Sequence, residues 1–236
     1  MPKINKDSTL NITFVGIGLC LLCSAIISFI AIQLRSVQEN NVVLDMQKKI
    51  VSSAGLDEVY GSVENAMSNI KTLIIDLDRG EIVDINPDTY ELSKELREDG
   101  KYKFLSAEED VASIKKREKY SKVYIEYKDN EINTLILPVR GYGLWGILYG
   151  YLAIEGDFNT VAGLEFYEHK ETPGLGAEID NPKWKALWKG KKIYQENGEV
   201  SLKVIKGSVM KTSDNFSYEI DGLSGACLLY TSDAAD

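Results

Sequence analysis

An uncharged apolar stretch near the start of the chain is the feature that most constrains its fold. No charged residue occurs between Ser8 and Leu34, and the segment from Ile12 to Ile32 is almost wholly apolar. As a helix this segment would span about 30 Å, the thickness of the hydrocarbon core of a bilayer. It lacks both the amphipathic pattern of a core helix and the small-x-small cleavage site of a secretory signal. We therefore predict a transmembrane helix over residues 10–34, preceded by a short stub over residues 1–9.

Composition excludes several classes of function. The formal net charge of −9 and the absence of a basic stripe argue against nucleic acid as a partner. Cys20 and Cys23 lie inside the predicted span, where packing explains them better than metal or redox chemistry. The chain has one histidine, His169, for which we expect a structural polar role rather than proton transfer. We find no dinucleotide-binding glycine motif and no metal-ligand cluster, so we predict no catalytic residue, no metal site and no NADH site in this chain.

The chain after the span divides into a helical connector and one domain. Over residues 35–70, apolar residues at helical spacing predict a helix that ends near Gly55, a plausible C-cap, and a second helix over residues 57–69. Residues 71–226 carry mainly strand signals and form the predicted domain. The charged stretch over residues 89–119 is interpreted as a peripheral insertion with short helical pieces.

Turn residues between apolar runs predict hairpins. One pairs residues 72–76 with 81–85, and another pairs residues 123–127 with 134–138. A long strand over residues 145–155 should turn back into residues 160–168. A last hairpin is expected around Asn197-Gly198, between residues 192–194 and 200–204. The sequence therefore predicts an α+β fold, a mostly antiparallel sheet with flanking helices.

Three motifs in the predicted domain combine glycines with apolar or small polar residues. GYGLWG (residues 141–146) could let a backbone approach a flat ligand beside two apolar side chains. This motif alone favours a simpler interpretation, a tight turn before a core strand with Trp145 buried. TPGLG (residues 172–176) is typical of a rigid turn. DGLSGA (residues 221–226) ends in the small residues Ser, Gly and Ala, a combination that is common and uninformative on its own. Each motif alone is weak evidence for a ligand site, and the order of the three along the chain is more informative.

In that order, and within the longer runs LILPVRGYGLWGILYGYLAIEGDFNTVAGLEFYEH and ETPGLGAEIDNPKW, the motifs resemble the C subunit of the sodium-translocating NADH:quinone reductase. This resemblance covers most of residues 135–226. It implies that FMN is bound through a phosphoester to a threonine in D-x-x-S-G-A-T, at a helix N-terminus that favours anions. It also implies that Thr172 and Leu175 touch the isoalloxazine ring. The cofactor-binding residues expected on this basis are Gly143, Leu144, Trp145, Thr172, Gly174, Leu175, Ser224, Gly225, Ala226 and position 227.

Position 227 departs from the family pattern, because it is Cys227 where the resemblance calls for the FMN-linked threonine. The decapeptide CLLYTSDAAD over residues 227–236 is what a sequencing-library adapter read in frame would encode. We therefore expect residues 227–236 to be a non-native tail. The chain as written should not become flavinylated, because the acceptor hydroxyl is missing.

The resemblance implies a membrane-anchored flavoprotein that relays electrons through covalent FMN within a sodium-pumping NADH:ubiquinone reductase. Expected partners are the other subunits, a flavin transferase during maturation and the lipid bilayer. Positive charges flank the span almost equally and do not orient it, whereas the resemblance implies a cytoplasmic stub and a periplasmic domain at the bacterial inner membrane. Two alternatives remain: the G subunit of the Rnf electron-transport complex, and a single-pass extracytoplasmic sensor or assembly domain without flavin.

Overall fold

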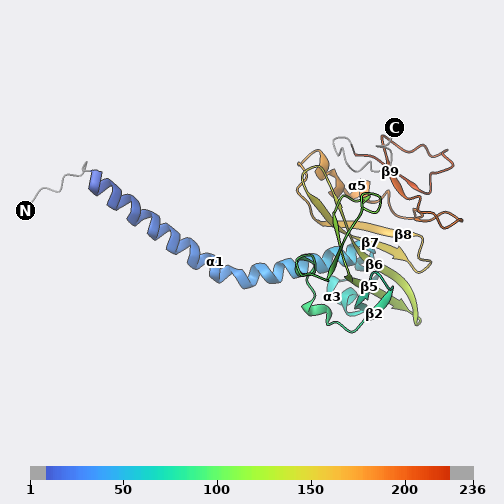
Figure 1. Ribbon diagram of the computed structural model, residues 1–236, viewed down its shortest axis with the longest axis horizontal. Helices are drawn as coiled ribbons and strands as arrows, with labels where there is room; N and C mark the ends of the chain where they lie inside the picture. The colour runs from blue at the N-terminus through green and yellow to red at the C-terminus, as the bar shows by residue number, and fades with distance from the viewer. Residues whose placement is uncertain (1–8, 224–236) are drawn as a thin grey trace, which may run out of the picture. The chain divides into compact units, whose positions relative to one another are not determined.

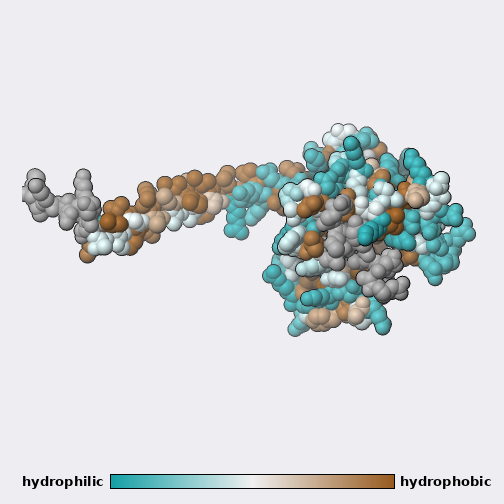
Figure 2. Space-filling model, turned by 90° about the horizontal axis from the view of Figure 1, so that it is seen from above, coloured by the Kyte–Doolittle hydropathy of each residue, from teal (hydrophilic) through white to brown (hydrophobic). Residues whose placement is uncertain are grey.

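The computed structural model describes residues 9–223. The chain divides into two compact units, residues 1–45 and residues 46–236. The first unit consists, where it is described, of most of helix α1, which runs from Thr9 to Ser53. Figure 2 shows apolar residues dominating the first part of α1 and hydrophilic ones following. In the described range, α1 is the one helix long and apolar enough to cross a membrane.

The helix that begins in the apolar stretch ends where the sequence predicts. The amide of Gly55 donates to the Ser52 carbonyl at 3.2 Å, and Gly55 has a φ of 66°, so glycine ends α1 in a left-handed conformation. The single helix predicted over residues 57–69 is wrong. It is split into α2 (Leu56–Tyr60) and α3 (Val63–Ser68), because Gly61 has a φ of 74° and the Ser62 side chain caps α3.

The second unit is built on a six-stranded antiparallel sheet (Figure 1). The strand order is β2-β1-β5-β6-β7-β8, and the predicted α+β class is confirmed. The turn between β5 and β6 has positive φ at both Asp129 and Asn130, as a two-residue hairpin requires. The strands are β1 (Ile70–Asp76), β2 (Glu81–Val83), β5 (Tyr120–Lys128), β6 (Glu131–Tyr142), β7 (Ile147–Glu155) and β8 (Val161–Glu168).

Buried side chains form one core on each face of the sheet. Alternation along β7 shows this directly: Tyr151 and Ala153 belong to one cluster, while Leu148 and Leu152 pack in the other. The first cluster includes Ile50 and Val51 from the last turns of α1. The second includes Ile179, Trp184 and Ile220 from the segments after the sheet.

The end of α1 lies directly against β8. A Cβ added at Gly163 would lie 2.4 Å from the carbonyl oxygen of Ser53, a residue only 1 % exposed. No side chain fits in that space, so glycine at position 163 allows the two backbones to approach each other.

The remaining elements include two small sheets and short helices. The hairpin expected over residues 192–204 is present only near its turn, where Tyr194 bridges Val200 and the Gln195 amide donates to the Glu199 carbonyl. Residues 203–205 pair instead, in parallel, with a distant strand that buries Ile220. The insertion over residues 89–119 carries a two-stranded antiparallel pair besides its helical pieces. These elements are η1 (Pro87–Thr89), α4 (Leu92–Glu95), β3 (Tyr102–Phe104), β4 (Lys116–Glu118), η2 (Gly176–Asp180), α5 (Pro182–Lys185), β9 (Lys203–Ile205) and β10 (Glu219–Asp221).

Candidate functional site

The first motif forms the turn between β6 and β7. The amide of Gly143 donates to the carbonyl of Gly146 at 2.7 Å, which closes the turn. The two apolar side chains inside it face solvent: Leu144 is 41 % exposed and Trp145 is 63 % exposed. The simpler interpretation, in which Trp145 is buried in the core, is therefore wrong.

The insertion supports this turn from one side. The amide of Tyr142 donates to the carbonyl of Ala112 at 2.8 Å, and Ala112 also lies beside Gly141. The insertion therefore contacts the end of β6 next to the first motif, and is less peripheral than the sequence suggests.

The second motif begins immediately after a buried carboxylate, Glu171. The Thr172 carbonyl accepts hydrogen bonds from the amides of Leu175 and Ala177, both at 3.1 Å, and Gly174 adopts a φ of 75°. This gives a compact turn in which Thr172 and Gly174 are exposed, and Leu175 is 51 % exposed.

Glu171 joins the two motifs, and sequence reasoning missed it. Its Oε1 accepts a hydrogen bond from the amide of Trp145 at 3.1 Å, across 26 positions of sequence. An added Cβ would lie 2.4 Å from Oε1 at Gly143 and 2.4 Å from Oε2 at Gly176. The carboxylate is thus enclosed by the glycines of both turns, which brings Gly143, Leu144 and Trp145 near Thr172, Gly174 and Leu175. In the sequence, the signal that could have identified Glu171 is its position directly before the TPGLG turn.

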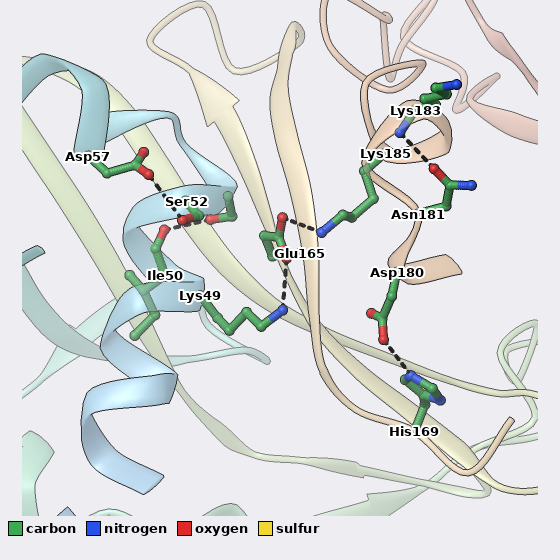
Figure 3. Close-up of polar contacts among 11 residues, drawn as sticks. Lys49, Ile50, Ser52, Asp57, Glu165, His169, Asp180, Asn181, Lys183 and Lys185 are labelled. Carbon is green, nitrogen blue, oxygen red and sulfur yellow. Dashed lines mark hydrogen bonds and ion pairs between the residues drawn. The ribbon is translucent and has the colours of Figure 1, made fainter. Parts of the chain in front are cut away.

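His169 holds the segment that carries Glu171. Its Nε2 lies 2.8 Å from Oδ2 of Asp180 in η2 (Figure 3), and its Nδ1 accepts the amide N–H of Glu171 at 3.3 Å. This pattern assigns the ring proton to Nε2 and leaves Nδ1 as the acceptor. His169 therefore orients the backbone.

The start of the third motif, at Asp221, is held by a tryptophan that follows the second motif in the sequence. Nε1 of Trp184, in α5, donates to the carbonyl of Asp221 at 2.7 Å, and Oδ1 of Asp221 accepts the amide of Val209 at 2.8 Å. The chain is thus fixed just ahead of residue 224. The predicted site residues Ser224, Gly225, Ala226 and Cys227 lie outside the described residues, as does the predicted tail over residues 227–236.

A partly buried ion cluster connects three elements of the domain. Glu165, on the edge strand β8, accepts from Lys49 of α1 at 3.1 Å and from Lys185 of α5 at 2.5 Å (Figure 3). The side chains of Glu165 and Lys185 are each 14 % exposed. One carboxylate therefore connects the end of α1 to the helix that carries Trp184.

Burial also shifts the protonation of aromatic groups in the core. Tyr124 packs edge-on against Tyr151, whose ring stacks on Tyr167 with centroids 4.9 Å apart. Burial raises the pKa of Tyr124 to about 12. Over residues 9–223 there is no group of three or more His, Cys, Asp or Glu side chains that could hold a metal ion.

Comparisons with known proteins show which family the chain resembles. A family model described as "FMN-binding domain" matches residues 143–234. The C subunit of the Na(+)-translocating NADH-quinone reductase of Pseudomonas aeruginosa is 45 % identical over 229 residues, which cover 95 % of this chain and 88 % of the relative. The protein of the same name from Vibrio anguillarum is 41 % identical over 224 residues, covering 95 % of this chain and 87 % of the relative.

Two solved structures share the fold. The crystal structure of Shewanella oneidensis NqrC matches with a TM-score of 0.69 at 29 % identity, covering 78 % of this chain and 84 % of that one. The C subunit of the Na(+)-translocating NADH-quinone reductase from Parabacteroides distasonis matches with a TM-score of 0.60 at 28 % identity, covering 83 % of this chain and 87 % of that one.

Proposed function

This chain belongs to the family of C subunits of the Na(+)-translocating NADH-quinone reductases, and we propose that the two turns joined by Glu171 hold the isoalloxazine ring of its FMN. The protein is a membrane-anchored FMN flavoprotein subunit of this oxidoreductase complex, whose other subunits are its partners. Both relatives named above are C subunits of such reductases, so the Rnf alternative is not favoured.

The observation that supports the location of the ring is the pair of turns sharing one buried carboxylate. Leu144, Trp145 and Leu175 leave apolar surface exposed on these turns, and a flat ring needs such a wall. Gly143 and Gly174 carry no side chain that would block its approach. Bound FMN supplies the electron-transfer chemistry, while these residues bind and orient it.

We place the attachment of the phosphate at position 227, following S-G-A, with a flavin transferase as the maturation partner. The experiment is co-expression of two proteins with a bacterial flavin transferase. One is the present chain, and the other is a chimera in which residues 227–236 are replaced by the C-terminal part of the Pseudomonas aeruginosa relative. We expect flavin fluorescence in a denaturing gel from the chimera alone, because the chain with Cys227 lacks the acceptor hydroxyl.

The matched control is the same chimera with its acceptor threonine changed to alanine, which should lose the fluorescent band. A band from the unaltered 236-residue chain would contradict attachment through a hydroxyl at position 227. A chimera that is expressed in the membrane but carries no flavin would contradict the proposed site.

We also propose that the domain faces the periplasm, with residues 1–9 in the cytoplasm. Alkaline phosphatase fused after residue 223 should then be enzymatically active, since it matures only outside the inner membrane, where disulfides form. The same enzyme fused at the N-terminus should be inactive. The reverse pattern would show a cytoplasmic domain.

A further inference from the structure

Glu171 is a buried carboxylate without a neutralising partner among the described residues. It is 8 % exposed, and within residues 9–223 no lysine, arginine or histidine forms an ion pair with it. The hydrogen bond that its side chain accepts in this range comes from the backbone amide of Trp145. Burying an unpaired charge is costly, and such charges concentrate at functional sites.

The glycines around this carboxylate make it the spacer between the two turns. An alanine at Gly143 or Gly176 would place its Cβ 2.4 Å from a carboxylate oxygen, so each turn is in contact with the carboxylate already. The two oxygens therefore set the separation of the turns, Oε1 on the side of Gly143 and Oε2 on the side of Gly176.

The main chain of Glu171 is also held by a hydrogen bond. His169 accepts the Glu171 amide and is itself bound to Asp180 (Figure 3). The carboxylate is thus positioned from the side of η2 before any ligand arrives.

We propose that Glu171 is a positioning residue for the flavin: it fixes the distance between the two turns and holds one negative charge beside the ring. This inference rests on the proposed location of FMN. A fixed negative charge opposes the arrival of electrons on a neighbouring group in a poorly solvated site, so it lowers the reduction potential of the flavin. Glu171 acts through position and charge and does not itself react.

The first test needs no flavin and uses the full chain. Hydrogen exchange at the Trp145 amide should accelerate about tenfold or more in Glu171→Ala, because the acceptor is lost. In Glu171→Gln the amide oxygen can still accept, so exchange should stay close to that of the parent. Unchanged exchange in Glu171→Ala would overturn the spacing role.

The second test uses the flavin-loaded chimera described above. Glu171→Gln removes the charge and keeps the shape, and should favour the reduced flavin about tenfold, a rise of about 30 mV for a two-electron couple. Glu178→Gln is the matched control: the Glu178 carboxylate, on η2, accepts a hydrogen bond from Asn181, so neither the potential nor the Trp145 exchange should change. An unchanged potential in Glu171→Gln would overturn the charge role, whereas a parent chimera without flavin would contradict the proposed function and leave the exchange result to decide the spacing role.

Discussion

Replacing Gly163 by alanine is expected to lower the free energy of unfolding of the domain by about 3 kcal/mol or more. The added Cβ would lie 2.4 Å from the carbonyl oxygen of Ser53, and neither backbone can move without disturbing the core around Val51. All three tryptophans lie in the domain, so denaturant titration in detergent micelles, followed by their fluorescence, reports this loss.

Gly141→Ala is the matched control for this substitution. Gly141 also lies in a strand, but a Cβ there would meet the Cβ of Ala112 at 3.8 Å, which is ordinary contact. We expect a change below about 1 kcal/mol. Equal effects of the two substitutions would mean that the end of α1 does not pack on β8 as described.

Replacing Glu165 by alanine should be the second most damaging change, at about 3 kcal/mol. It leaves Lys49 and Lys185 without their shared acceptor, although the first keeps 27 % and the second 14 % of its side chain exposed. The same denaturant titration measures the loss. Glu91→Ala, which removes an exposed pair with Lys94, should cost less than about 0.5 kcal/mol.

A triple substitution separates lost charge pairing from lost packing at Glu165. Changing Glu165 to leucine together with Lys49 and Lys185 to methionine removes all three charges and keeps apolar volume. Buried ion clusters replaced in this way often retain their stability. The triple variant should therefore recover most of the loss seen in Glu165→Ala, and an equally unstable triple variant would contradict an electrostatic cause.

Local signals in the sequence predict those parts of the fold that depend on neighbouring residues. Gly55 marks the end of the first helix, and Asp129-Asn130 marks a hairpin, because each conformation is set within a few residues. The parallel pairing of β9 with β10 could not be predicted in this way, since it depends on burial of Ile220 in a core assembled from distant segments.

The same distinction between local signals and long-range contacts applies to the candidate site. The turns at residues 143–146 and 172–176 can be recognised from glycine and proline, and their apolar residues are exposed as a ligand wall requires. That the two turns share the carboxylate of Glu171 depends on a contact across 26 positions, which no local pattern contains. In the sequence, a glutamate beside a turn cannot be distinguished from an ordinary surface residue, and the fold shows that Glu171 is buried.

The anchoring of Asp221 by Trp184 limits how far a cofactor attached beyond it can travel. From Leu223 to position 227 an extended chain reaches at most about 14 Å. A ligand tethered by so short a segment has an effective concentration at its site in the millimolar range or above, whatever its concentration in the surrounding medium. Dilution in the surrounding solution would then not remove the flavin from its site, and the residues around the ring would only have to set its orientation.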